Sequence, residues 1–155
     1  GLIGDSGGGH ITAVMAHEYK NLIDYQILIY PFVDFVNEYE SAKEFSEDHY
    51  ILTPDLIQFF IHNFLKDKST AATPTISPLL NEDFSNLPKC LIIAAELDPI
   101  VDHSRAYYNK LRENSIECDL HIIKGVVHGY FSNGFAFKKG WKETESLIVN
   151  FLKNF

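Results

Sequence analysis

Short apolar runs alternate with segments of helical spacing along most of the chain. Three runs rich in Ile, Leu or Ala are typical of strands buried on both faces, and they span residues 25–30, 90–95 and 119–124. Three further segments carry apolar residues at the period of an amphipathic helix, and they span residues 7–20, 102–112 and 138–153. Strands separated by helices predict an α/β fold with a parallel sheet, as one domain over residues 1–155.

The segment from residue 37 to residue 69 does not fit this alternation. Residues 37–50 are acidic and mixed in character. Thr53-Pro54 then supplies an N-cap followed by proline at the first helical position. A wide apolar stripe follows at helical spacing, made of Ile57, Phe60, Ile61, Phe64 and Leu65. We expect residues 37–69 to form a helical lid outside the sheet.

The sequence Gly4-Asp5-Ser6-Gly7-Gly8 fits Gly-x-Ser-x-Gly, a pattern that seats a nucleophilic serine on a tight turn between a strand and a helix. The serine takes a strained backbone conformation there, and side chains at the flanking glycines would clash. The Gly7 amide opens the following helix, so it can donate to a developing oxyanion. An amphipathic helix with Ile11, Val14 and Met15 on one side begins at once, which favours a catalytic turn over an ordinary glycine-rich one.

Two other interpretations of this motif are less consistent with its surroundings. A phosphate-binding loop would continue with Gly-Lys-Ser/Thr, which this chain lacks. The motif also resembles the nucleophile signature of chymotrypsin-like proteases, which usually continues with Pro where this chain has Gly9. In those enzymes His and Asp precede the Ser, among short strands and disulfides. Here a helical pattern follows and almost the whole chain lies downstream, so we reject the protease-barrel interpretation.

An acid and a base follow the serine at the positions that such a nucleophile requires. Asp98 comes just after the 90–95 run, and His128 comes just after the 119–124 run. The carboxyl ends of parallel strands meet at one edge of a sheet, so residues distant in sequence can meet there. We expect His128 to take the proton of Ser6 and deliver it to the leaving alcohol, with Asp98 fixing the imidazole tautomer.

Several residues compete for these roles. Asp98 could instead cap a helix, because Asp-Pro often begins one, and Asp102 is the alternative acid. His10 lies near the serine and is a candidate for substrate contact. The remaining histidines lie in predicted helices (His17, His62, His103), in a strand (His121) or in the proposed lid (His49). No histidine pair at i, i+4 with a glutamate suggests a metal site, and no cofactor motif is found.

Charge and composition narrow the classes of partner. The formal charge is −8, which argues against nucleic acid or an anionic membrane surface. No apolar run reaches the roughly 20 residues of a membrane-spanning helix. Cys90 and Cys118 give no disulfide framework, so we interpret both as buried structural thiols. The lack of an Asn-x-Ser/Thr acceptor favours a cytosolic address, with the compartment otherwise open.

Taken together, these motifs resemble those of the hormone-sensitive lipase family of α/β hydrolases, which includes many carboxylesterases. Gly4–Gly9 is similar to that family's nucleophile turn, where Ala is commoner at position 7. Ser77–Leu80, Leu87-Pro88 and Leu91–Pro99 are similar to its approach to the triad acid, and His128–Tyr130 matches its His-Gly-Phe. The resemblance covers nearly the whole chain. It implies an α/β-hydrolase fold and a small-molecule ester as substrate.

Two departures from the family pattern concern the start of the chain. The family's oxyanion loop, His-Gly-Gly-Gly, lies upstream of the nucleophile and is absent here. The first strands of the family's sheet and its N-terminal lid helices are also missing. We therefore expect the chain to be the C-terminal part of the catalytic domain, holding the triad and the Gly7 donor, and to be weak or inactive alone.

The leading function is a serine carboxylester hydrolase that acts through an acyl-enzyme. Three alternatives stay open from the sequence: a peptidase of the same fold, an inert truncated product, and a small-molecule receptor. Plant gibberellin receptors look like this family but lack the triad histidine, so the presence of His128 argues against a receptor. The oligomeric state and the acyl and alcohol preferences are not encoded in any motif.

Overall fold

The computed structural model describes residues 1–47 and 50–154. Its described strands form one parallel sheet in the order β1-β2-β3-β4. These strands are β1 (Leu2–Asp5), β2 (Tyr25–Ile29), β3 (Lys89–Leu97) and β4 (Cys118–Val127). The three predicted runs are therefore strands, and the residues before the serine form a further short strand. The prediction of a parallel α/β fold is confirmed.

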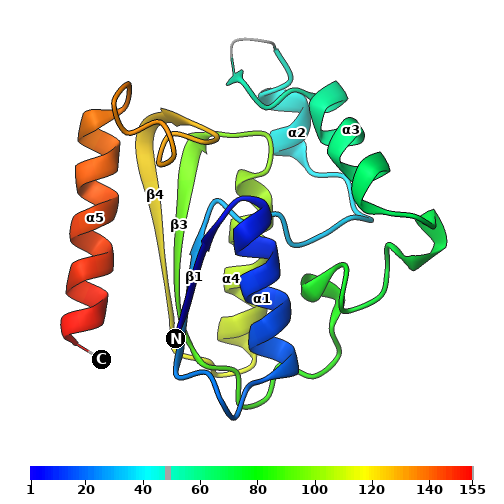
Figure 1. Cartoon of the computed structure of the whole chain (residues 1–155), viewed down its shortest axis with the longest axis vertical. Coiled ribbons are helices and arrows are strands. Elements are labelled where there is room, and N and C mark those ends of the chain that lie inside the picture. Colours follow the sequence, from blue (N-terminus) through cyan, green and yellow to red (C-terminus); the bar gives the residue numbers. More distant parts are fainter. Residues whose placement is uncertain (48–49, 155) are drawn as a thin grey trace.

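Helices cover both faces of this sheet (Figure 1). Helices α1 (Gly7–Glu18) and α4 (Val101–Glu113) lie on one face, and α5 (Lys138–Lys153) lies on the other. Alternate residues of a strand point to opposite faces. Accordingly, Leu28 and Ile92 pack in the core beneath α1 and α4, while Ile27 and Ile93 pack in the core beneath α5.

The first helix turns a different face inward from the one that its large apolar residues suggest. Its buried residues are small or polar, and they are Gly9, His10, Thr12, Ala13, Ala16 and His17. Ile11 and Met15 are 59% and 37% exposed. Close approach of α1 to the sheet explains why small residues face inward, because a Cβ added at Gly9 would lie 3.3 Å from the Gly4 carbonyl in β1 and 3.0 Å from the Pro31 side chain just after β2. Small side chains let this helix pack closely on the sheet.

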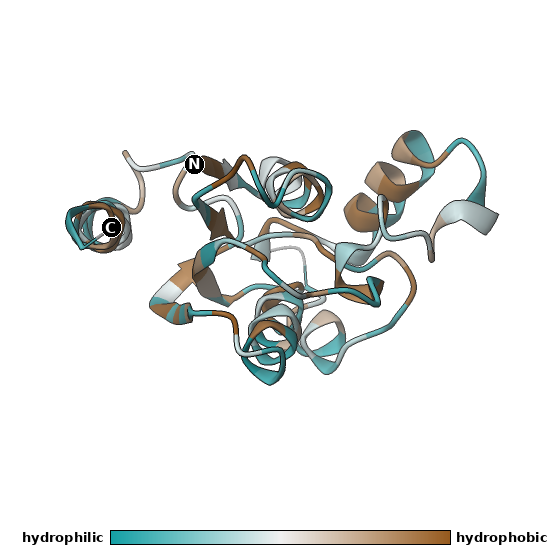
Figure 2. Ribbon diagram, turned by 90° about the horizontal axis from the view of Figure 1, so that it is seen from below, coloured by the Kyte–Doolittle hydropathy of each residue, from teal (hydrophilic) through white to brown (hydrophobic). Residues whose placement is uncertain are grey.

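The segment between β2 and β3 lies largely outside the sheet. It contains α2 (Glu40–Glu44), α3 (Pro54–Phe64) and the short 3-10 helices η2 (Lys68–Thr70) and η3 (Pro78–Leu80). Helix α3 begins as predicted, with the Thr53 side chain accepting from the Leu56 amide and Pro54 at the first position. Figure 2 shows α3 away from the sheet with hydrophobic residues along it. The lid assignment for 37–69 stays a prediction, and its residues 48 and 49 lie outside the described residues.

Two further sequence predictions concern the core and the membrane. Cys90 and Cys118 are both buried and free, and they are paired in register across β3 and β4. None of the helices in the described part of the chain is long and apolar enough to cross a membrane.

Candidate active site

Three polar side chains from three strand ends meet at the carboxyl edge of the sheet. Ser6 follows β1, Asp98 follows β3 and His128 follows β4. The Ser6 Oγ lies 2.8 Å from His128 Nε2, and His128 Nδ1 lies 2.7 Å from Asp98 Oδ2. These distances are those of hydrogen bonds. The structure therefore brings together the three residues that the sequence singled out.

The serine occupies a strained turn between β1 and α1. Its backbone has φ 52° and ψ −118°, in the region that non-glycine residues rarely adopt. The Ser6 amide donates to the carbonyl of Ile29 at 2.9 Å, which fixes the turn against β2. This backbone conformation directs the serine hydroxyl toward the strand ends instead of into the sheet.

The two glycines that flank Ser6 in the motif, Gly4 and Gly8, differ in how much space a side chain would have. A Cβ at Gly4 would overlap the carbonyl of Gly8, so only glycine fits there. A Cβ at Gly8 would meet nothing closer than Asp5 Oδ1 at 3.9 Å. The expected clash therefore holds at Gly4 and does not hold at Gly8, because α1 rises away from the turn at that point.

The buried carboxylate of Asp98 serves two purposes. Its Oδ2 binds His128, and its Oδ1 accepts from the Ile100 amide at 3.0 Å. Asp98 does not cap α4, because the N-cap residue of that helix is Ile100 and no side chain caps it. The Oδ1 bond closes a turn just before the helix, so the geometry favours the triad interpretation of Asp98 over the capping one. A carboxylate held on both sides orients the imidazole firmly, because neither oxygen is free to rotate away.

The alternative acid, Asp102, binds elsewhere. Its Oδ1 accepts from Arg105 at 2.7 Å, and its Oδ2 accepts from the Ser41 amide at 3.0 Å. Burial works to raise the pKa of Asp102, but these hydrogen bonds and the Arg105 charge lower it overall. Asp102 therefore anchors α2 to α4, and the geometry favours Asp98 as the partner of His128.

The other described histidines have structural partners or lie away from the serine. His10 Nε2 donates to the Ile76 carbonyl at 2.8 Å, which uses that nitrogen. His17 binds the Tyr107 hydroxyl at 3.1 Å. His103 accepts the Val33 amide at 3.3 Å, and burial lowers its pKa to about 4. His62 and His121 are exposed, and His49 lies outside the described residues.

Gly7, the predicted oxyanion donor, directly follows Ser6. It is the first residue of α1, so its amide belongs to the helix turn whose N–H groups lack helical acceptors. Gly7 is exposed, and a Cβ added there would meet nothing within 4 Å. The position can therefore accept alanine, which is the residue that the resembling family more often has.

Sequence reasoning missed Tyr30, which packs against His128. Its ring centroid lies 4.7 Å from that of His128, and its hydroxyl donates to Asp5 at 3.0 Å. Tyr30 has a left-handed φ of 38° and is almost fully buried. Its position before Pro31, at the end of a predicted strand, was the available signal, because strand ends at this edge carry the polar groups.

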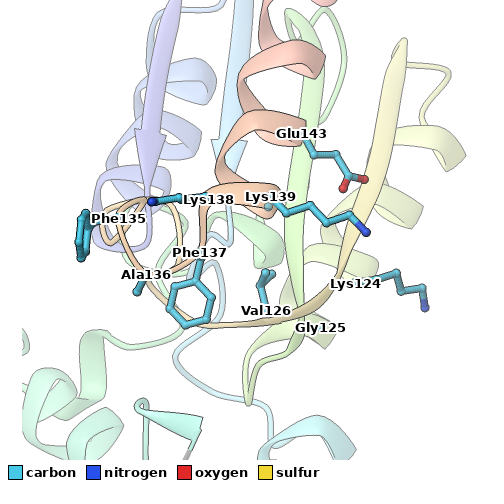
Figure 3. Close-up of a pocket in the computed structure, with 10 residues that line it drawn as sticks. Lys124, Gly125, Val126, Phe135, Ala136, Phe137, Lys138, Lys139 and Glu143 are labelled. Carbon is cyan, nitrogen blue, oxygen red and sulfur yellow. The ribbon is translucent and has the colours of Figure 1, made fainter.

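A separate cavity of about 740 Å³ lies between β4 and the start of α5. Its lining includes Lys124, Val126, Phe137 and Lys139, as Figure 3 shows. These residues come from β4, the following turn and α5, so this cavity lies apart from Ser6 and gives no support to an ester site. Among the described residues, no group of three or more His, Cys, Asp or Glu side chains could hold a metal ion.

The chain is similar in sequence to several esterases. The family model described as "alpha/beta hydrolase fold" matches residues 1–132. A carboxylic ester hydrolase, LipN, of Mycobacterium tuberculosis is 32% identical over 138 residues, which cover 83% of this chain and 36% of that protein. An arylesterase of Saccharolobus solfataricus is 26% identical over 133 residues, which cover 84% of this chain and 44% of that protein.

Solved structures agree with these relatives. The Francisella virulence factor BioJ superposes with a TM-score of 0.90 at 31% identity, covering 99% of this chain and 51% of that one. A Pyrobaculum calidifontis esterase gives 0.88 at 30% identity, covering 95% and 50%. The chain therefore spans about half the length, or less, of the proteins that it matches.

Proposed function

Because the chain belongs to the α/β-hydrolase fold family, we propose that it is the C-terminal part of a serine carboxylester hydrolase, with Ser6, His128 and Asp98 as its triad. The continuous line of hydrogen bonds from Ser6 through His128 to Asp98 is the observation that carries this proposal. The names of the relatives, an arylesterase and a carboxylic ester hydrolase among them, support the same reaction class.

The proposed reaction proceeds through an acyl-enzyme. Ser6 Oγ attacks the ester carbonyl carbon while His128 Nε2, 2.8 Å away, takes the hydroxyl proton. The tetrahedral intermediate collapses as the imidazolium returns that proton to the leaving alcohol. Water then repeats the sequence and releases the acid. Asp98 holds the proton-bearing Nδ1, which leaves Nε2 free to accept from the serine.

The developing oxyanion requires amide donors at the nucleophile turn. We assign one of them to Gly7, at the N-terminal end of α1, where the helix dipole adds positive potential. Further donors would come from an upstream oxyanion loop of the complete protein. Losing one donor typically costs about 10²–10³ in rate, so the 155-residue chain alone should hydrolyse esters poorly.

The substrate proposed is a neutral and fairly apolar ester. Helix α3 places Phe64 against His10 and Phe35, with ring centroids 5.3 Å and 5.4 Å apart. His10 lies one turn into α1 after Ser6, and its amide donates to the Ser6 carbonyl at 3.0 Å. An aromatic cluster joins the segment 37–69 to the nucleophile helix. This arrangement supports a lid that roofs an apolar site.

Turnover of a short-chain nitrophenyl ester by the full-length protein tests the proposal. We expect Ser6→Ala and His128→Ala to lower kcat by at least about 10³, and Asp98→Asn to lower it somewhat less, because the base matters more than its orienter. Asp102→Asn serves as the matched acid control and should retain most activity. Equal activity in Ser6→Ala, or a greater loss in Asp102→Asn than in Asp98→Asn, would contradict the assignment.

A further inference from the structure

One carboxylate oxygen ties together three segments around the proposed triad. Asp5 Oδ2 accepts the Tyr30 hydroxyl at 3.0 Å and the Ser132 hydroxyl at 2.7 Å. Asp5 ends β1 and directly precedes Ser6, Tyr30 follows β2, and Ser132 lies in the turn four residues after His128. Both bonds have normal hydrogen-bond lengths. The nucleophile turn and the histidine turn are thereby joined through a single side chain.

Tyr30 carries this link to the imidazole itself. Its ring lies against the His128 ring, with centroids 4.7 Å apart and planes inclined by 57°. Burial raises the pKa of the Tyr30 hydroxyl well above its usual value, so the group stays protonated and donates to Asp5. The left-handed φ of 38° is costly for a tyrosine, on the order of 1–3 kcal/mol. Backbone strain of this kind concentrates at functional sites, where the surrounding structure holds it in place.

Ser132 makes the second half of the link from the surface. It is exposed, so its hydroxyl could be satisfied by water without any protein partner. Its 2.7 Å bond to Asp5 therefore adds little to the free energy of unfolding. The bond joins the turn that carries His128 to the strand end that carries Ser6.

We propose that Asp5 is a positioning residue that holds His128 in reach of Ser6, acting through Tyr30 and Ser132. This inference rests on the proposed function. The hydrogen bonds to Ser6 and Asp98 hold the imidazole at its two nitrogens, and they do not prevent the ring from rocking about the line between them. The Tyr30 ring limits that motion from one face. Asp5 keeps Tyr30 and the Ser132 turn in a fixed relation to the nucleophile, because Asp5 and Ser6 are consecutive residues.

This role requires an acceptor oxygen and not a charge. Asparagine at position 5 can place its amide oxygen where Oδ2 now accepts both hydroxyls, whereas alanine removes that shared acceptor from Tyr30 and Ser132. A displacement of about 1 Å at a reacting group can cost about 10² in rate. Asp5→Ala should therefore slow the reaction of Ser6 far more than Asp5→Asn.

The test measures the reaction of Ser6 with a fluorophosphonate in the full-length protein, as separate kinact and KI values. We expect Asp5→Ala to lower kinact by about 10–100-fold with KI within about twofold, and Asp5→Asn to stay within about threefold of the parent on both. Ser132→Ala, a surface change that should leave folding intact, should lower kinact by a few-fold. Asp83→Ala is the matched control, since Asp83 also accepts from a serine hydroxyl, that of Ser85, but away from the triad.

Each outcome separates this inference from the proposed function. If the parent protein does not react at Ser6, the proposed function is wrong and so is the positioning role of Asp5. If the parent protein reacts and the Asp5→Ala and Ser132→Ala variants have an unchanged kinact, the positioning role of Asp5 is wrong and the proposed function stands. A change confined to KI, or an Asp5→Asn loss as large as that of Asp5→Ala, would also overturn the positioning role. If Asp5→Ala does not fold, Asp5→Asn and Ser132→Ala decide the question.

Discussion

Strand β3 and helix α3 are both strongly apolar in sequence, but the structure treats them differently. Residues Cys90–Ala95 of β3 are almost entirely buried, between two neighbouring strands and beneath helices on both faces. Helix α3, all of whose residues are described, buries none of them. Its Phe59, Phe60 and Phe64 are 59%, 55% and 49% exposed.

The difference lies in what surrounds each element. The periodicity of a segment indicates whether it is a strand or a helix, but its burial depends on which other segments reach it. β3 is a central strand, whereas the aromatic contacts of α3 with other described elements are made by Phe64 at its last turn. An apolar stripe thus predicts the secondary structure of α3 well and its burial poorly.

The largest expected effect comes from deleting side-chain volume in β3. Ile92→Ala should lower the free energy of unfolding by about 2–5 kcal/mol, because Ile92 is fully buried in the core under α1 and α4. Phe59→Ala removes a larger side chain from α3 and should change the free energy of unfolding by less than about 1 kcal/mol. Urea unfolding of both variants checks the contrast. Equal losses would mean that α3 is buried in solution.

The same contrast applies to two histidines. His103 is a buried residue of α4, and burial lowers its pKa to about 4 from the ordinary value of 6.5, whereas His62 on α3 is exposed. Between these pH values His103 binds a proton more readily in the unfolded chain than in the folded one. The contribution of His103 to stability therefore falls as the pH is lowered from 6.5 to 4. His103 should contribute on the order of 2–3 kcal/mol to that loss.

Unfolding free energies of the parent, His103→Gln and His62→Gln over that range provide the measurement. The His103→Gln curve should be flatter than the parent curve, and the His62→Gln curve should follow the parent. If His103→Gln loses as much stability as the parent when the pH is lowered, other groups, such as the buried His17, account for the pH dependence.

The candidate site was more predictable from sequence than the packing around it. Ser6, Asp98 and His128 follow from a local turn motif and from the rule that parallel strands end at one edge. The inward face of α1 did not follow, because it depends on how closely that helix approaches β1 and β2. The Asp5–Tyr30 bond could not be predicted either, since it joins two strand ends through side chains whose directions only the folded backbone sets.

Resemblance to a family supplied what local patterns could not. It implied the α/β-hydrolase fold, and the family match over residues 1–132 and the superposition on solved structures confirm it. The lid role of residues 37–69 and the catalytic roles of the triad stay predictions. Helix α3 formed where its periodicity predicted it, but nothing in that periodicity indicated that its aromatic side chains would stay exposed.

The central claim is that Ser6 is a nucleophile activated by His128, and peptide mapping after fluorophosphonate treatment tests it most directly. The full-length protein should carry one adduct, on the peptide that contains Gly4-Asp5-Ser6-Gly7-Gly8, and Ser6→Ala should carry none. His128→Ala should reduce the adduct strongly, although Ser6 is still present. An adduct that persists in Ser6→Ala, or that forms equally fast in His128→Ala, would contradict the claim.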